Sequence, residues 1–87
     1  MRRSLSAVKR EDIAVALGYN KHRDSAPSVV AVGRRLGACE VRKVARRYGI
    51  PVHYDDCLAD KLSGCIAEEE IPAEVYDDVA RVFALRA

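Results

Sequence analysis

Short apolar runs and one helix-length segment alternate through the middle of the chain. Residues 28–32 form a β-branched run closed by Gly33, and residues 50–54 form a second run preceded by Gly49. Residues 36–48 lie between them and are rich in Arg, Ala and Val. This order predicts a strand–helix–strand unit. A connection of this length returns the second strand parallel to the first, by a right-handed crossover.

A further strand is predicted over residues 12–19, where large and small side chains alternate. The larger ones share one face, and the other face carries only Ala14, Ala16 and Gly18. Because side chains of a strand alternate between the two faces of its sheet, we expect a helix to pack closely against this small face. Residues 20–28 contain several turn-forming residues and predict a polar loop.

The crossover helix has a predicted apolar stripe, which consists of Ala38, Val41, Ala45 and Tyr48, with Val44 beside them. Gly49 is placed to end this helix in the left-handed conformation. Asp55 or Asp56 is expected to cap a short helix that ends before Gly64. Pro72 opens a final helix. Its expected core positions are Val75, Val79, Val82 and Phe83, broadened by Tyr76, Ala80 and Leu85.

These elements predict an α/β fold, with a small mixed sheet of three or four strands and helices packed around it. The 87 residues suffice for one small domain, which we assign to residues 9–87. Residues 1–8 are expected to be a flexible segment or an edge strand. The chain has neither a signal-peptide pattern nor an apolar run of about 20 residues. Three cysteines without paired spacing argue against a disulfide framework, and we expect a cytoplasmic protein.

Charge is distributed unevenly along the chain. Residues 1–54 hold 12 Lys and Arg against 4 Asp and Glu, whereas residues 55–87 hold 3 against 9. The two halves are expected to attract each other in the fold, although a nucleic-acid-binding face is an alternative. No helix-turn-helix, RNP or KH signature accompanies the basic residues, which favours a solvated face or an acidic partner. This predicted basic face consists of Arg34, Arg35, Arg42, Lys43, Arg46 and Arg47.

Four blocks of the sequence carry a family resemblance. Residues 13–19 (IAVALGY) and 25–33 (SAPSVVAVG) resemble the signature AVALKY…APVVVAKG of the FlhB/YscU type III export-switch proteins. Residues 45–52 (ARRYGIPV) resemble the end of the family's crossover, and residues 71–84 resemble its terminal helix. The similarity covers residues 9–86 and is to the C-terminal cytoplasmic domain of these proteins of flagella and injectisomes.

The resemblance implies a protein-binding module rather than an enzyme. In the family this domain lies below the membrane export gate and docks export substrates and other apparatus components. A small apolar patch is associated with receiving early substrates. Carried over by motif, this patch consists of Ala26, Pro27, Ala80 and Phe83. No cofactor or metal is implied, and contact with the membrane is expected only through the export gate.

The chain departs from the family at the autocleavage motif. Family members cleave themselves at Asn-Pro-Thr-His through cyclisation of the Asn side chain, and the matching positions here are Lys9, Arg10, Glu11 and Asp12. Because lysine has no side-chain amide to attack the backbone carbonyl, we expect no cleavage. The chain resembles short FlhB-like proteins that lack both the motif and the membrane domain.

Two other kinds of chemistry have weaker support in the sequence. A Cys–His hydrolase would require a nucleophile such as Cys39 beside a base such as His53, each oriented by further groups. His53, Asp55 and Cys57 could suggest a metal site, but the paired spacing of zinc ligands is absent. We therefore expect Cys39, Cys57 and Cys65 to be small apolar residues of the core.

Overall fold

The computed structural model describes residues 4–20, 22–24, 26–65 and 67–85. Its elements follow the predicted order of strands and helices. They are β1 (Ser4–Arg10), β2 (Ile13–Tyr19), β3 (Ser28–Arg34), α1 (Leu36–Arg47), β4 (Val52–Tyr54), α2 (Asp56–Leu62), the 3₁₀ turn η1 (Ala73–Val75) and α3 (Tyr76–Leu85). None of the helices that the structure describes is long and apolar enough to cross a membrane.

The four strands form one mixed sheet in the order β3-β2-β1-β4. β2 runs antiparallel to both β1 and β3, and β4 runs parallel to β1. β3 and β4 are therefore parallel, as predicted, but they occupy opposite edges of the sheet with β1 and β2 between them. The prediction that residues 1–8 form a flexible segment or an edge strand is wrong for residues 4–8, because they belong to β1, which pairs on both sides. Residues 1–3 of that predicted segment lie outside the described residues.

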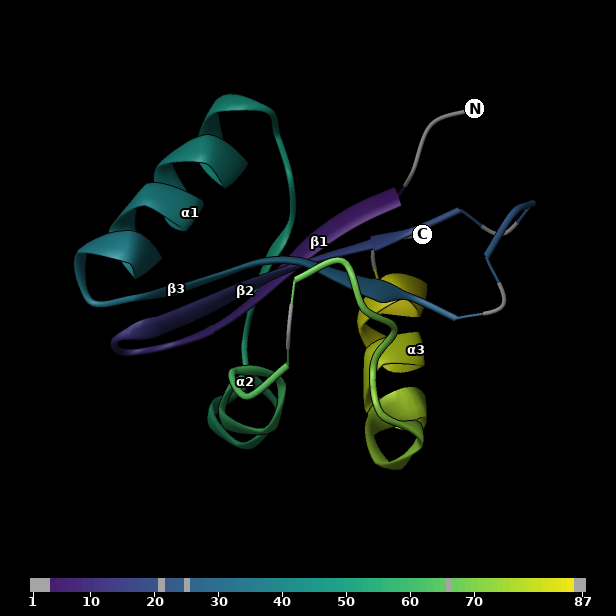
Figure 1. Cartoon of the computed structure of the whole chain (residues 1–87). Coiled ribbons are helices and arrows are strands. Elements are labelled where there is room, and N and C mark those ends of the chain that lie inside the picture. The colour runs from purple at the N-terminus through teal and green to yellow at the C-terminus, as the bar shows by residue number, and fades with distance from the viewer. Residues whose placement is uncertain (1–3, 21, 25, 66, 86–87) are drawn as a thin grey trace.

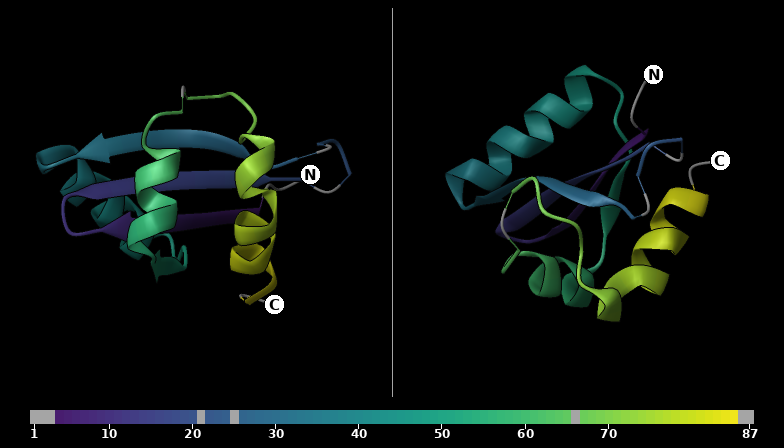
Figure 2. Two further views of the ribbon diagram at one scale, coloured as in Figure 1. Left: turned by 90° about the horizontal axis from the view of Figure 1, so that it is seen from below. Right: turned by 45° about the vertical axis from the view of Figure 1, so that its right-hand side comes forward.

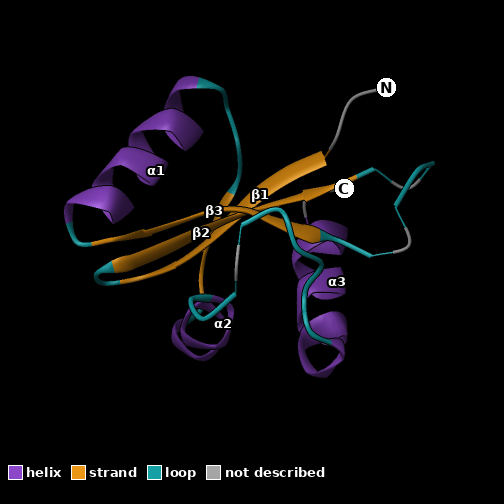
Figure 3. Ribbon diagram, in the orientation of Figure 1, coloured by secondary structure: helices purple, strands orange, loops and turns teal. Residues whose placement is uncertain are grey.

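The helices cover the two faces of the sheet unequally. α1 lies on one face, whereas α2 and α3 lie side by side on the other (Figures 1 and 3). The turned views show the same three layers, with the strands between the helices (Figure 2). This arrangement confirms the predicted α/β class with helices on both faces of a small mixed sheet.

The main core lies between the sheet and the α2/α3 layer. Large apolar side chains from the strands and helices form one buried cluster there, which includes Val8, Val15, Leu17, Val29, Leu58, Leu62, Val75 and Val79. Cys65 and Phe83 are partly buried against the same cluster. This face of the sheet supplies most of the apolar area that stabilises the fold.

The α1 face is built from small residues, as the pattern of β2 predicts. Ala7, Ala16 and Ala31 are cross-strand neighbours on β1, β2 and β3. A Cβ atom at Gly33 would collide with the carbonyl oxygen of Gly37 at the start of α1. α1 therefore approaches the end of β3 at a distance that only glycine at position 33 permits.

The termini of the helices follow the predicted capping residues. Gly49 has φ +68°, and the Ile50 amide donates to the Ala45 carbonyl oxygen at 2.8 Å in a Schellman-type end. The Asp55 carboxylate accepts a hydrogen bond from the Leu58 amide at 3.0 Å and caps α2.

The predicted apolar stripe of α1 is partly wrong. Ala38 and Ala45 are buried, but Val44 and Tyr48 are exposed.

Candidate functional site

A pocket of about 480 Å³ opens between the end of β2, the loop before β3, and α3. All four residues of the predicted substrate patch line it. Ala26 and Pro27 come from the loop, and Ala80 and Phe83 come from α3. We call this space the docking pocket. Its complete lining is Tyr19, Ala26, Pro27, Tyr76, Asp77, Ala80 and Phe83.

The loop that carries Ala26 and Pro27 is held by its own hydrogen bonds. The Asn20 carbonyl oxygen accepts from the Asp24 amide at 2.8 Å, and the Asp24 carboxylate accepts from the Asn20 amide at 3.0 Å. The Pro27 carbonyl oxygen accepts from the Ile71 amide at 3.1 Å, just before η1 and α3. The first two hydrogen bonds hold the loop in shape, and the third ties it to the segment that leads into α3. The loop wall and the α3 wall of the docking pocket are therefore connected by a backbone hydrogen bond.

The exposure of the four patch residues differs in a way that matters for binding. Ala26 is buried, Pro27 and Phe83 are half-buried, and Ala80 is exposed. The Phe83 ring packs 6.0 Å from the Tyr19 ring, at an interplanar angle of 51°. Phe83 therefore joins the floor of the pocket to the core, whereas Ala80 forms a wall that a ligand can touch. Asp77 is the charged residue among those that line the pocket.

The predicted basic face is not a single surface in the structure. Arg35, Lys43, Arg46 and Arg47 are exposed, but Arg42 is half-buried and donates to the Cys39 sulfur at 3.4 Å. Arg34 donates from Nη2 to the Ser63 carbonyl oxygen at 2.9 Å. Ser63 follows α2, which lies on the opposite face of the sheet from α1, so Arg34 is separated from the other five. Whether a partner binds the remaining cations stays a prediction.

The four positions that match the autocleavage motif lie at the end of β1 and in the tight turn to β2. The Lys9 side chain is buried, with its ammonium 5.1 Å above the centre of the Tyr54 ring. Arg10 lies 3.8 Å from Asp12 and 3.2 Å from Asp60 of α2. β1 and β2, which flank this turn, pair along their whole length, and the ion pairs of Arg10 also hold the turn. None of the four side chains carries an amide group.

The cysteines and His53 lie in different surroundings. Cys39 is half-buried on α1 beside Arg42, and His53 lies on β4 with a buried Nε2 that has no hydrogen-bond partner among the described residues. Cys57 is exposed, so its predicted place in the core is wrong. Burial, aided by the charges of Glu69 and Glu74, raises the pKa of the Cys65 thiol. Within the described residues, no group of three or more His, Cys, Asp or Glu is placed to hold a metal ion.

Sequence reasoning missed part of the docking pocket. Tyr19 and Asp77 were assigned only to a strand and a helix, because nothing in the apolar pattern shows that the end of β2 and α3 line one pocket. Tyr76 was expected to broaden the core stripe, but it is 44% exposed and lines the pocket. The signal that found the other four residues was the family motif rather than periodicity.

Comparisons with known proteins agree with this architecture. The family model described as FlhB HrpN YscU SpaS Family matches residues 10–85. The chain is 34% identical over 71 residues to YlqH of Bacillus subtilis, an uncharacterized protein, covering 82% of this chain and 76% of YlqH. It is 38% identical over 73 residues to the flagellar biosynthetic protein FlhB of Aquifex aeolicus, covering 83% of this chain. That match spans only 21% of FlhB.

A solved structure supports the same relationship. The cytoplasmic domain of FlhB from Shewanella putrefaciens superposes with a TM-score of 0.85 and 34% sequence identity. The match covers 91% of this chain and 62% of that domain. Sequence and fold therefore agree over nearly all of the chain. The chain belongs to the FlhB HrpN YscU SpaS family of type III export proteins.

Proposed function

We propose that this chain is a non-enzymatic protein-binding module of a type III export apparatus, which works in the cytoplasm and captures short apolar segments of export substrates. Family membership supports the link to export. The single observation that carries the docking role is that Ala26, Pro27, Ala80 and Phe83, which are distant in sequence, line one pocket.

The shape and chemistry of the docking pocket suit weak and transient binding. An exposed Ala80 and a half-buried Pro27 leave space for an incoming apolar side chain, and the Phe83 ring offers it a contact surface. A contact with a short peptide segment buries far less area than a stable protein interface, so complexes should form and dissociate quickly. An export apparatus must release each substrate, and rapid dissociation meets that requirement.

The variant Ala80→Asp tests this role directly. Because Ala80 is exposed, a carboxylate there should leave the fold intact while it places a charge against the apolar side chain of a bound segment. We expect binding of N-terminal peptides of export substrates to fall at least tenfold, which corresponds to about 1.4 kcal/mol. The measurement is a titration of ¹⁵N-labelled protein by NMR, since such spectra report weak binding and folding together.

A matched control is Ala73→Asp, which introduces the same carboxylate at an exposed alanine of η1 outside the pocket lining. It should bind the peptides like the native chain. Equal binding by Ala80→Asp and the native protein would refute the docking assignment, as would unfolding of Ala80→Asp. Phe83 is unsuitable for the test, because truncating a large aromatic residue that packs against the core costs about 3–5 kcal/mol.

The same proposal includes an intact backbone at the degenerate cleavage motif. Lys9 carries an ammonium in place of the amide that would attack its own carbonyl. Purified protein should therefore stay a single chain of 9.6 kDa at neutral pH over days, as measured by intact-mass spectrometry. A spontaneous break between Lys9 and Arg10 would contradict this expectation.

A further inference from the structure

The fold places a cluster of cations and a cluster of acidic residues on opposite faces of the sheet. α1 and the residue before it carry five cations, Arg35, Arg42, Lys43, Arg46 and Arg47, against one acid, Glu40. The other face carries α2 with its cap, η1 and α3, which together hold six acidic residues. Three further acidic residues, Glu68, Glu69 and Glu70, lie in the connector that pairs with the edge strand β3. Because these layers lie on opposite sides of the strands, the domain is electrostatically polar across its thickness (Figure 1).

Large apolar side chains are exposed on the same basic helix. Leu36 is 82% exposed, Val44 is 48% exposed, and Tyr48 is 70% exposed. With Glu40, these residues follow one another at intervals of four and form a single ridge along α1. Lys43 and Arg47 form the neighbouring ridge on the solvent side. We call these two ridges together the outer α1 surface.

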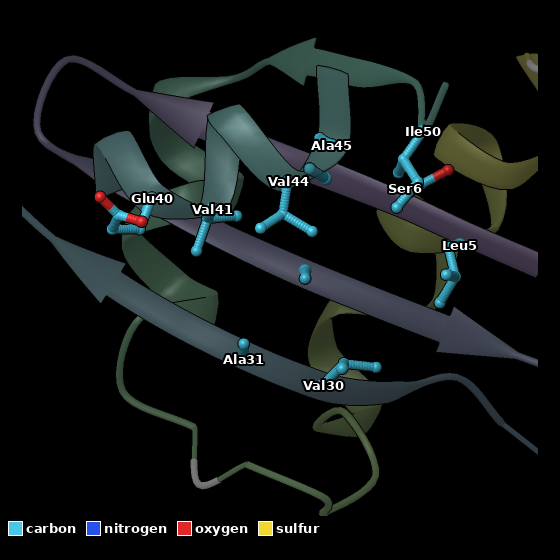
Figure 4. Close-up of a pocket in the computed structure, with 11 residues that line it drawn as sticks. Leu5, Ser6, Val30, Ala31, Glu40, Val41, Val44, Ala45 and Ile50 are labelled. Atoms are coloured by element: carbon cyan, nitrogen blue, oxygen red, sulfur yellow. The ribbon is translucent and has the colours of Figure 1, made fainter. Parts of the chain in front are cut away.

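The apolar part of this surface continues onto the sheet. A groove of about 290 Å³ opens between one side of α1 and the strands. Val41 and Val44 line it from the helix, and Leu5 and Val30 line it from β1 and β3 (Figure 4). The small residues beneath α1 do not fill this space, so the ridge and the groove expose apolar side chains beside the cations, with Glu40 among them.

We propose that the outer α1 surface binds an anionic lipid bilayer. Lys43 and Arg47, aided by Arg46, would meet the lipid headgroups, and Leu36, Val44 and Tyr48 would enter the interface between headgroups and acyl chains. Helices that lie on membranes combine cations with exposed apolar side chains in this way. A nucleic acid would match the charge of the cations but would leave the apolar ridge without a partner, so the combination favours lipid.

Charge complementarity also fixes the orientation of the bound domain. The acidic α2/α3 layer is repelled by the anionic surface while α1 is attracted to it, so the domain would bind with α1 toward the lipid. The docking pocket is built on α3, on the far side of the sheet. It would remain open toward the aqueous side, and lipid binding and peptide docking could occur on one molecule at once. This inference does not depend on the docking role.

The test is binding of the whole chain to vesicles, measured by co-sedimentation. Vesicles of phosphatidylcholine with about 30% phosphatidylglycerol should bind the protein at low salt, and vesicles of phosphatidylcholine alone should bind it far less. The variant Lys43→Gln with Arg47→Gln should weaken binding about 30-fold, as expected for two cations near a charged surface. Raising the salt to about 0.5 M should weaken native binding strongly.

A matched control is a second double variant with the same net charge as the Lys43→Gln/Arg47→Gln variant. Lys61→Gln with Arg81→Gln removes two exposed cations from the α2/α3 layer. It should bind the anionic vesicles like the native chain. Equal weakening by the two double variants would overturn the proposal, because net charge rather than the outer α1 surface would then control binding. Absence of native binding to the anionic vesicles would overturn it as well.

Insertion can be followed with a single tryptophan, because the chain has none. Tyr48→Trp places the reporter on the ridge, and Tyr76→Trp places it on the opposite layer. The emission of the Tyr48→Trp variant should shift to the blue on addition of anionic vesicles, while that of the Tyr76→Trp variant should not change. Tighter binding to a short DNA duplex than to the vesicles, or a shift with neither reporter, would refute the assignment to lipid.

Discussion

The two faces of the sheet are packed by different means. The face toward α2 and α3 is filled with interlocking Val and Leu side chains that are almost fully buried. The face toward α1 carries Ala and Gly residues on which the helix lies at short distance, with an open groove beside it that Leu5 and Val30 line. One face therefore gains stability from apolar area, whereas the other depends on close approach of the backbones and leaves apolar side chains of its helix exposed.

The comparison suggests a division of roles between stability and recognition. Both candidate binding surfaces lie where the packing is incomplete. The docking pocket lies at the margin of the well-packed face, where α3 meets the loop before β3, and the outer α1 surface lies on the sparsely packed face. Changes at the buried cluster should therefore unfold the domain, and changes at these margins should alter binding alone.

The largest expected difference is between truncations on the two faces. Leu17→Ala removes a fully buried side chain from the main core and should lower the free energy of unfolding by about 3 kcal/mol. Val44→Ala removes an exposed side chain and slightly improves helix propensity, so it should change stability by no more than about 0.5 kcal/mol. Urea denaturation of both variants measures the difference. Similar losses would show that the groove side of α1 contributes to the core.

A smaller effect tests the close approach itself. Gly33→Ala places a methyl group against the Gly37 carbonyl oxygen, so that α1 or β3 must move. We expect a loss of about 1–3 kcal/mol, the usual range for overpacking a tightly packed site. Gly64→Ala is the control, because a Cβ atom there meets no atom within 4 Å. If Gly33→Ala is as stable as this control, α1 can shift freely over the sheet.

Local rules of the sequence predicted most of the elements that these variants probe. The alternation of large and small residues on β2 predicted that a helix would cover the Ala and Gly face. Gly49 and Asp55 marked helix ends because their conformational and capping preferences act within a few residues. Such local preferences hold in the folded protein because they do not depend on distant parts of the chain.

Errors arose where tertiary contacts outweigh the local pattern. Residues 1–8 were expected to be a flexible segment or an edge strand because the N-terminal residues are polar and basic, with only Leu5 and Val8 as large apolar residues. Ser6 and Lys9 are nevertheless buried in β1, an inner strand. Periodicity placed Val44 and Tyr48 on the apolar stripe, but the small sheet residues draw only Ala38 and Ala45 into full contact. Arg34 was grouped with α1 by sequence proximity, whereas the strand directs it to Ser63.

The smallest expected effect concerns the charges that distinguish the two faces. Lys43 and Arg47 are exposed, and Lys43 lies 3.9 Å from Glu40 within the same helix. An exposed ion pair of this kind contributes little, so Lys43→Gln with Arg47→Gln should change the free energy of unfolding by no more than about 0.5 kcal/mol. Arg10→Gln is the variant to compare with it, because Arg10 of β1 forms an ion pair with Asp60 of α2, which is distant in the sequence. Thermal melts at low and high salt measure both. A sharply lowered melting temperature for the Lys43/Arg47 variant would mean that these cations belong to an internal charge network with the acidic half of the chain, and would remove them as free contacts for a partner.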